Sequence, residues 1–253
     1  MSGSLLEAVQ VVARLAGDVA LAHYRTALTV ESKGDGSPVT IADREAEEAA
    51  RAWIAQRFPT DGILGEEFGA VEGTSGRRWL LDPIDGTKSF VRGVPLWGTL
   101  IAVTEGDQVI AGAAYFPAVN EIVAAAPGEG CWWNGRRASV STVDTLASAT
   151  ALITDDRTFG SPLQRDAWDT LASEVAVARG WGDCFGYLLV ATGRAEVMVD
   201  PIINPWDAAC FLPIIEEAGG VFTSLSGERT AFGGHAVATN AALASAARGF
   251  FDA

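Results

Sequence analysis

Histidine and cysteine are scarce in this chain of 253 residues, and both shortages limit its chemistry. It has two histidines, His23 and His235, and three widely spaced cysteines, Cys131, Cys184 and Cys210. Zinc sites use histidine and cysteine ligands at close spacing, so a zinc centre is not expected. The odd cysteine count, without any Cys-x-x-Cys pair, indicates free thiols in a reducing compartment.

Basic residues and long apolar runs are also few. The chain has 18 Lys and Arg against 32 Asp and Glu, a formal net charge of −14. This charge disfavours general electrostatic binding to nucleic acid or to an anionic membrane. No uncharged apolar run reaches the ~20 residues of a membrane span. Leu5, Val9, Val12 and Ala16 recur at helical spacing and predict an amphipathic helix, not a signal peptide. We therefore expect a cytoplasmic protein.

The hydrophobic pattern predicts alternating helices and strands in a chain long enough to bury a large core. Helices are expected at residues 4–28, 162–178, 186–192, 206–218 and 240–252. A further helix is expected to begin at a cap at Thr40 or Asp43 and to end at about Phe58. Strands are expected at 63–65, 78–81, 99–105, 109–116, 121–126, 149–154, 196–199 and 236–239. Residues 33–38 and 70–76 predict loops. The pattern predicts a layered α/β or α+β protein with a soft boundary near residue 136, between residues 1–136 and 137–253.

An acidic motif follows the predicted strand at 78–81, with the sequence Asp82-Pro83-Ile84-Asp85-Gly86-Thr87. Pro83 is rigid and Gly86 permits a sharp turn, so the two carboxylates are presented together. Unpaired carboxylates are costly to bury, and oxygen ligands suit hard cations, Mg²⁺ above all. Thr87 begins a predicted short helix, where free backbone amides favour an anion. This combination is typical of phosphoryl transfer, although a plain Asp-rich capping turn is the alternative.

Four further acidic residues have simple structural explanations when each is taken alone. The adjacent pair Glu66 and Glu67 follows Gly65 and could be a solvated loop. Asp207 lies in the first turn of a predicted helix after Pro205, and Asp43 follows Thr40 in the same way. A carboxylate in a first helical turn is often a cap with no further role.

Taken together, four motifs resemble those of the inositol monophosphatase family, in the family's order. They are Thr40-Ile41-Ala42-Asp43, Gly65-Glu66-Glu67, Asp82-Pro83-Ile84-Asp85-Gly86-Thr87 and Trp206-Asp207-Ala208-Ala209. The resemblance extends from residue 1 to roughly 250. It implies the sugar-phosphatase-like α+β fold, a layered α-β-α-β-α sandwich, and a homodimer that hydrolyses a small-molecule phosphate ester with two or three Mg²⁺ ions.

The resemblance also implies a role for each motif residue. Glu66, Asp82 and the backbone carbonyl of Ile84 match the ligands of a first metal, and Asp82, Asp85 and Asp207 match those of a second. A third, weaker ion would lie near Glu66, with Asp43 and Glu67 in its outer shell. The implied catalytic residues are Thr87, Asp43 and Glu66, of which Thr87 and Asp43 orient the attacking water. The amides of Gly86 and Thr87 match the phosphate cradle.

Two segments of the C-terminal half resemble the histidinol-phosphate phosphatase branch of this family, residues 179–187 and 194–201. They contain Asp183 and Asp200, which with Asp207 are the candidate substrate-binding carboxylates. Asp200 lies seven residues before Asp207, where inositol phosphatases carry a glutamate that meets sugar hydroxyls. Histidinol phosphate carries an ammonium group and inositol phosphate carries no cation, so two carboxylates facing the leaving group favour histidinol phosphate.

The sequence therefore predicts a Mg²⁺-dependent phosphatase that hydrolyses L-histidinol phosphate in histidine biosynthesis. One alternative is inositol monophosphatase activity, or broad activity on small phosphate esters, on the same scaffold. The other alternative belongs to a different class, a regulatory binding protein that keeps the fold and acts through a partner. The full set of metal ligands and the negative charge weigh against that reading.

Overall fold

The computed structural model describes residues 4–34, 36 and 38–251, and its first half is built on an eight-stranded sheet. The strand order is β10-β9-β8-β7-β6-β5-β3-β4, and β3 and β5 form its parallel pair. The strands are β3 (Gly62–Gly65), β4 (Gly69–Val71), β5 (Arg77–Asp85), β6 (Gly98–Glu105), β7 (Gln108–Phe116), β8 (Glu121–Ala126), β9 (Gly130–Trp133) and β10 (Arg136–Arg137). A short 3₁₀ helix, Pro117–Val119, joins β7 to β8.

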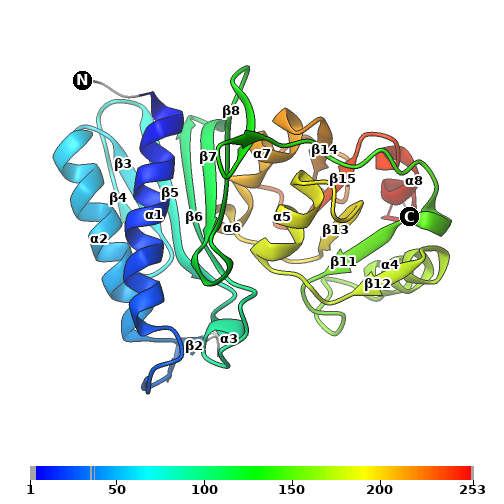
Figure 1. Cartoon of the computed structure of the whole chain (residues 1–253), viewed down its shortest axis with the longest axis horizontal. Helices are drawn as coiled ribbons and strands as arrows, with labels where there is room; N and C mark the ends of the chain where they lie inside the picture. Colours follow the sequence, from blue (N-terminus) through cyan, green and yellow to red (C-terminus); the bar gives the residue numbers. More distant parts are fainter. Residues whose placement is uncertain (1–3, 35, 37, 252–253) are drawn as a thin grey trace.

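Two long helices cover one face of this sheet, α1 (Leu5–His23) and α2 (Ile41–Arg57) (Figure 1). Each begins with a capping box, from Ser4 in α1 and Thr40 in α2, which satisfies free amides of the first turn. Both faces of β5 are buried: Trp79 and Leu81 pack with the helices, and Leu80 packs on the opposite side. The sheet is therefore an internal layer.

The second half contains a five-stranded sheet in the order β12-β11-β13-β15-β14. Its strands are β11 (Thr150–Ile153), β12 (Val177–Arg179), β13 (Val197–Asp200), β14 (Gly220–Thr223) and β15 (Ala236–Asn240). Helices α5 (Cys184–Ala191), α6 (Pro205–Ala208) and α7 (Phe211–Glu217) lie between the two sheets, and α4 (Pro162–Glu174) and α8 (Ala244–Arg248) cover the outer face (Figure 1). The predicted α-β-α-β-α sandwich is confirmed.

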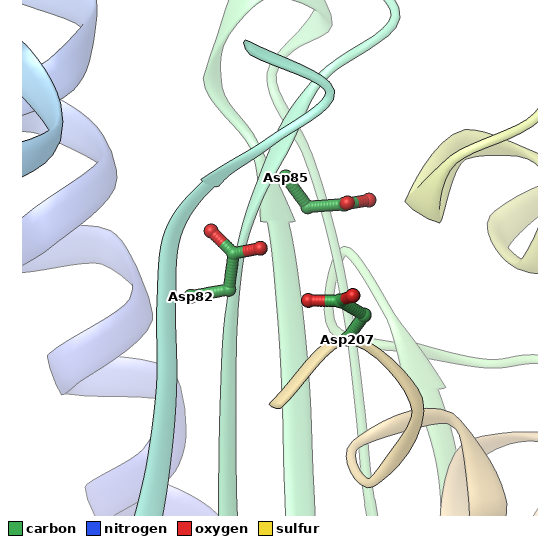
Figure 2. A group of neighbouring side chains, drawn as sticks. All are labelled: Asp82, Asp85 and Asp207. Carbon is green, nitrogen blue, oxygen red and sulfur yellow. The ribbon is translucent and has the colours of Figure 1, made fainter. Parts of the chain in front are cut away.

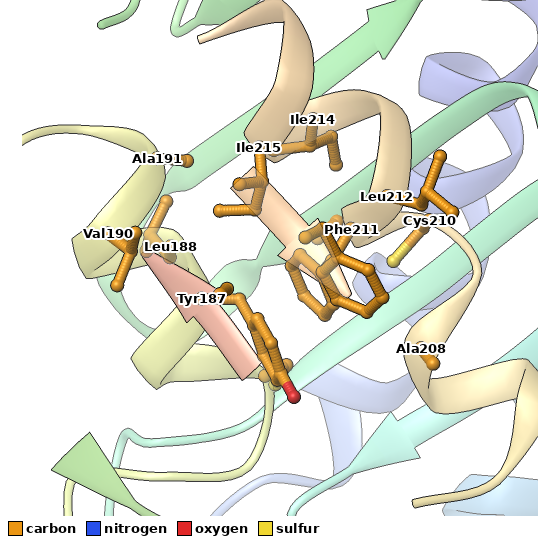
Figure 3. Close-up of a cluster of buried hydrophobic side chains, with 14 of the residues drawn as sticks. Tyr187, Leu188, Val190, Ala191, Ala208, Cys210, Phe211, Leu212, Ile214 and Ile215 are labelled. Carbon is orange, nitrogen blue, oxygen red and sulfur yellow. The ribbon is translucent and has the colours of Figure 1, made fainter. Parts of the chain in front are cut away.

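The middle layer binds the two halves through one continuous core (Figure 3). The ring of Tyr187 on α5 stacks on that of Phe211 on α7, with centroids 4.6 Å apart. Leu80 and Leu100 of the first sheet belong to the same cluster as Met198 of the second. Burial of this shared apolar surface fixes how the two sheets face each other.

Four predicted helices are shorter than expected or are interrupted. The helix predicted at 4–28 ends at His23, because Tyr24 turns to an extended conformation and packs against Phe90 and Trp97. The helix predicted at 162–178 ends at Glu174. Residues beyond it form β12 beside β11, in keeping with the strand preference of the β-branched Val177.

The continuous helix predicted at 206–218 is wrong, since the chain forms α6 and then α7. Pro213 has no N–H to donate to the carbonyl four residues earlier, so it is accommodated in the first turn of a new helix beginning at Phe211. The predicted closing helix is also shorter. Asn240 ends β15 and its side chain accepts from the Leu243 amide at 2.9 Å, before α8 and a 3₁₀ helix at Gly249–Phe251.

Several short strands were not predicted from the sequence. They are β4, β9, β10, β12, β14 and the pair β1 (Glu31–Ser32) and β2 (Pro38–Val39). Strand β4 overlaps the start of the loop expected at 70–76. The loop expected at 33–38 lies between β1 and β2, and its residues 35 and 37 are outside the described residues. Two small helices complete this part of the chain, α3 (Thr87–Phe90) and a 3₁₀ helix at Leu146–Ser148. Within the described ranges, no helix has the length and hydropathy needed to cross a membrane.

Candidate active site

Asp82, Asp85 and Asp207 gather their carboxylates where the first sheet meets the middle layer (Figure 2). One oxygen from each lies within 4.8 Å of the others. Asp82 and Asp85 are both on β5, and an irregularity in the β5–β6 pairing between them turns both side chains to the same side. Asp207 comes from α6, so residues separated by more than a hundred positions complete one acidic cluster.

Each of these carboxylates is fixed by hydrogen bonds on one side. Asp82 Oδ1 accepts from the Ile84 amide at 2.9 Å, and Asp85 Oδ2 accepts from the Cys184 amide at 2.5 Å. Asp207 Oδ2 accepts from the backbone and side-chain nitrogens of Asn204, both at 3.2 Å. Asp207 Oδ1 is buried without a hydrogen-bond partner in the part of the chain that the structure describes. An unpartnered carboxylate oxygen aimed into an acidic cluster is suited to bind a cation.

The cluster is electrostatically strained without a cation. Burial, and then the charges of Glu66, Asp207 and Asp85, raise the pKa of Asp82 well above its ordinary value. Burial and neighbouring carboxylates likewise raise the pKa of Asp85 to about 7 and that of Asp207 to about 7. A hard cation would remove this repulsion, and the all-oxygen ligand set suits Mg²⁺. The residues present therefore fit a magnesium site.

Glu66 and Glu67 lie in the turn between β3 and β4, next to the cluster. Lys33 Nζ contacts Glu66 Oε1 and Glu67 Oε1, each at 2.6 Å. Glu66 is close enough to the cluster to raise the pKa values of Asp82 and Asp207. Its Oε1 is nevertheless paired with Lys33. Burial raises the pKa of Glu67 to about 7 in spite of that lysine. The sequence did not single out Lys33.

Asp43 and Thr87 meet across the site from α2 and α3. Asp43 Oδ2 accepts from the Thr40 amide at 2.8 Å and from its hydroxyl at 2.7 Å. The Thr87 hydroxyl lies 3.5 Å from Asp43 Oδ1 and 3.0 Å from the carbonyl oxygen of Ile84. Burial raises the pKa of Asp43 above its ordinary value. The Thr87 hydroxyl is therefore nearer to the Ile84 carbonyl oxygen than to Asp43.

Gly86 and Asp183 face each other at the start of α3 and α5. Gly86 has φ +85°, and a side-chain carbon there would lie 2.8 Å from the Leu96 carbonyl oxygen, so glycine is required. Asp183 also has a positive φ of 48°, and its amide donates to Thr154 Oγ1 at 2.8 Å. Burial and Asp85 raise the pKa of Asp183 to about 7, against the opposing charge of Lys88.

Asp200 is buried on β13, with 4% of its surface exposed. Its Oδ2 accepts a hydrogen bond of 2.8 Å from the hydroxyl of Tyr187. A cavity of about 50 Å³ lies beside it, lined by Asp85, Thr154, Asp183, Cys184, Tyr187, Asp200, Ile202, Ile203, Asp207 and Phe211. Four carboxylate-bearing residues therefore border one small space, two from the metal cluster and two from the substrate-binding candidates. Thr154 and Asp183 also line a larger cavity of about 1330 Å³ between the two halves.

Sequence reasoning missed one buried carboxylate near the site, Glu47 on α2. It lies four residues after Asp43, and this helical spacing puts both on the same face of α2. An acidic residue on the otherwise apolar face of a predicted helix is the signal that could have found it. Its amide partners lie in the turn that follows β3, far along the chain, and the sequence gives no indication of that contact.

A layered sandwich with an acidic cluster between its sheets is an arrangement that suits metal-assisted hydrolysis of a phosphate ester. The model of the inositol monophosphatase family matches residues 3–250, and the chain belongs to this family. A histidinol-phosphatase of Chlorobaculum parvum is 43% identical over 224 residues, covering 88% of this chain and 86% of the relative. A histidinol-phosphatase of Mycobacterium tuberculosis is 40% identical, covering 85% of each chain.

The chain is also similar to relatives that are named for other activities, and to solved structures. An inositol-1-monophosphatase of Mesorhizobium japonicum is 35% identical over 205 residues, covering 79% of this chain and 77% of the relative. The crystal structure of the extragenic suppressor protein suhB from Bartonella henselae superposes with a TM-score of 0.92 at 27% identity, covering 98% of both chains. These similarities confirm the fold and leave the substrate to be argued from the site.

Proposed function

We propose that the protein is a Mg²⁺-dependent phosphatase that hydrolyses L-histidinol phosphate to L-histidinol and phosphate, a step of histidine biosynthesis. The observation that carries this proposal is the 50 Å³ cavity in which Asp183 and Asp200 join Asp85 and Asp207. Carboxyl groups that line a cavity beside a phosphate-hydrolysing centre favour a leaving group that carries a cation, because a cation would keep them ionised and pair with them. Histidinol has an ammonium group, and the names of the two histidinol-phosphatase relatives support the same substrate.

The acidic residues divide into two proposed metal positions. Asp82, Asp85 and Asp207 would hold one Mg²⁺, and Glu66, Asp82 and the carbonyl of Ile84 would hold another. A third, weaker ion is proposed near Glu66, with Asp43 and Glu67 around it. Bound Mg²⁺ would supply Lewis-acid stabilisation of the phosphoryl and leaving oxygens and would make hydroxide available near neutral pH. Lys33 would have to release Glu66 Oε1 for that oxygen to bind metal.

Thr87 and Asp43 are proposed to position the attacking water and to take up its proton. The Thr87 hydroxyl can pass its proton to Asp43 Oδ1 as it accepts one from water, because Asp43 Oδ2 is already occupied by Thr40. The backbone amides of Gly86 and Thr87 would hold the phosphate oxygens. In the overall reaction one water O–H bond and the ester P–O bond break, and a new P–O bond and the alcohol O–H bond form.

Phosphate release from L-histidinol phosphate tests the proposal. The purified protein should release phosphate in the presence of Mg²⁺, lose that activity on treatment with EDTA, and regain it when Mg²⁺ is restored. Changing Asp183→Asn should raise KM for histidinol phosphate by about tenfold, the effect of losing ~1.4 kcal/mol of binding. The proposal fails if the Mg²⁺-loaded protein releases no phosphate from this ester.

Inositol monophosphatase activity is the second candidate, supported by the family and by the 35% identical Mesorhizobium relative. The four carboxylates around the small cavity weigh against it, because inositol carries no cation to pair with them. A regulatory binding role without catalysis is less favoured, since the acidic cluster is intact. Comparing phosphate release from inositol 1-phosphate with release from histidinol phosphate distinguishes the two phosphatase activities. A phenotype that survives Asp82→Asn would favour the regulatory binding role.

The remaining features implied by the resemblance are proposals of the same kind. The division near residue 136 falls at β10, the last strand of the first sheet, and we propose residues 1–136 and 137–253 as two subdomains. We also propose a cytoplasmic homodimer. Light scattering on the purified protein would give twice the mass of one chain if the dimer forms, and the mass of one chain if it does not.

A further inference from the structure

Glu47 is a fully buried carboxylate that holds the turn carrying Glu66. It lies on α2, has 0% of its surface exposed, and is one helical turn beyond Asp43. A buried charge is stable only when it is paired and hydrogen-bonded. The partners that Glu47 uses therefore show what this residue does.

All the hydrogen-bond partners of Glu47 are donors, and two of them are backbone amides of the β3–β4 turn. Glu47 Oε2 accepts from the Glu67 amide at 2.8 Å, and Oε1 accepts from the Phe68 amide at 3.3 Å. Arg51 Nε donates to Oε1 at 2.7 Å and balances the charge. The carboxylate lies so close to the turn that a side-chain carbon on Gly65 would overlap Oε1.

The peptide groups on both sides of Glu66 are held by hydrogen bonds, one to Leu81 and one to Glu47. The Glu66 amide donates to the Leu81 carbonyl at 3.1 Å, and the next amide, that of Glu67, is held by Glu47. The parallel pairing of β3 with β5 sets Gly65 opposite Leu81, which puts Glu66 next to Asp82. Glu47 thus holds one of the two peptide groups that flank Glu66, and Leu81 holds the other.

We propose that Glu47 is a positioning residue for metal binding, acting through the turn that presents Glu66 and Glu67. The inference rests on the proposed Mg²⁺ site and deepens it. A glutamine cannot replace Glu47 without loss, because its amide nitrogen is a donor facing donors. Residues that support metal ligands in this way typically change metal affinity by 10–100-fold when they are replaced.

The test is the dissociation constant of Mg²⁺, measured by isothermal titration calorimetry on the full chain with Glu47→Gln. We expect the constant for the tightest Mg²⁺ to rise by about tenfold or more. Glu45→Gln is the matched control, since Glu45 is on the same helix, half exposed and paired with His23. It should bind Mg²⁺ as the wild type does. Circular dichroism shows whether each variant is folded. If Glu47→Gln does not fold, Glu47→Asp takes its place, because it keeps the charge but withdraws the carboxylate from the turn.

The outcomes separate this inference from the proposed function. A folded Glu47 variant whose Mg²⁺ constant stays within twofold of the wild type overturns the positioning role alone. A wild type that binds Mg²⁺ but releases no phosphate from histidinol phosphate overturns the substrate and leaves Glu47 in its role. A wild type that binds no Mg²⁺ overturns both. Recovery of phosphate release in Glu47→Gln at high Mg²⁺ is also expected, and a purely structural residue would not produce it.

Discussion

Tyr187 donates a hydrogen bond of 2.8 Å to Asp200 Oδ2, and both side chains are buried. The tyrosine ring stacks on Phe211, which follows Asp207 by four positions on the neighbouring helix (Figure 3). One oxygen of Asp200 is therefore occupied, and burial raises the pKa of this carboxyl well above its ordinary value, against the hydrogen bonds from Thr154 and Tyr187. The proposed substrate-selecting carboxylate and the proposed metal-binding segment at Asp207 are therefore held by the same hydrophobic cluster.

Replacing Tyr187 with phenylalanine should therefore weaken substrate binding more than chemistry. Without the hydroxyl, Asp200 loses a donor and turns away from the position in which it would meet an ammonium group. We expect KM for histidinol phosphate to rise by about tenfold, equivalent to ~1.4 kcal/mol, with kcat within about twofold. Steady-state kinetics on histidinol phosphate and on p-nitrophenyl phosphate, which has no cation, should show the effect on the first substrate only.

Tyr24→Phe is the matched control for that change. The Tyr24 hydroxyl is buried and has no partner among the residues described, so its removal breaks no hydrogen bond. KM for histidinol phosphate should stay at the wild-type value in this variant. Equal effects of Tyr187→Phe on the two substrates would contradict the assigned role of the Tyr187–Asp200 pair.

Asp82→Asn should abolish activity and stabilise the metal-free protein. Asp82 is buried among Glu66, Asp207 and Asp85, and removing its charge relieves their repulsion. The same change removes a ligand shared by both proposed metals, so kcat/KM should fall at least about 1000-fold. Thermal unfolding in EDTA at pH 8 should show a higher Tm than the wild type. A lower Tm would mean that the cluster is not under charge strain.

The stability of the metal-free protein should fall as pH rises. The pKa values of Asp85 and Asp207 are raised to about 7 in the folded chain from an ordinary value of 3.8, chiefly by burial. A carboxyl with a raised pKa stabilises the folded state below its unfolded pKa, and this contribution is lost as pH passes through the folded value. We expect Tm in EDTA to drop by about 5–10 °C between pH 5 and pH 8. Saturating Mg²⁺ should reverse most of that loss at pH 8, whereas a Tm that rises with pH in EDTA would contradict this account.

The Thr87 hydroxyl gives a direct test of the proposed proton path. Thr87→Val keeps the shape of the side chain and removes the group between water and Asp43, so kcat should fall by about 100- to 10,000-fold. Thr87→Ser keeps the hydroxyl and should retain most of the activity. Single-turnover phosphate release at saturating Mg²⁺ measures both. Equal activity in the two variants would exclude the hydroxyl from the reaction.

Much of the site could be predicted from the sequence because its residues lie in short contiguous motifs. Asp82 and Asp85 belong to one motif, in which Pro83 and Gly86 indicated that the two carboxylates are presented together. The meeting with Asp207 depends on the packing of α6 against the first sheet, and only the resemblance to a family suggested it. Lys33 and Glu47 were missed because their contacts join distant segments, and neither belongs to a quoted motif.

The helices and strands were predicted well where the hydrophobic periodicity is strong. They were predicted poorly where tertiary contacts determine the secondary structure. The strand at 121–126 agrees with β8 residue for residue, and long helices were placed within a few positions of their starts. The interruption between α6 and α7 follows from Pro213, a local signal that the apolar run concealed. The edge strand β4 has only three residues, and it forms because β3 lies beside it.

The most direct test of the central claim compares two substrates on one preparation of the Mg²⁺-loaded protein. The carboxylates around the small cavity predict a kcat/KM for L-histidinol phosphate at least about 100-fold above that for inositol 1-phosphate, which corresponds to ~2.7 kcal/mol of discrimination. Changing both Asp183 and Asp200 to asparagine should reduce that ratio by about tenfold or more. Equal rates on the two esters, or a preference for inositol 1-phosphate, would contradict the account.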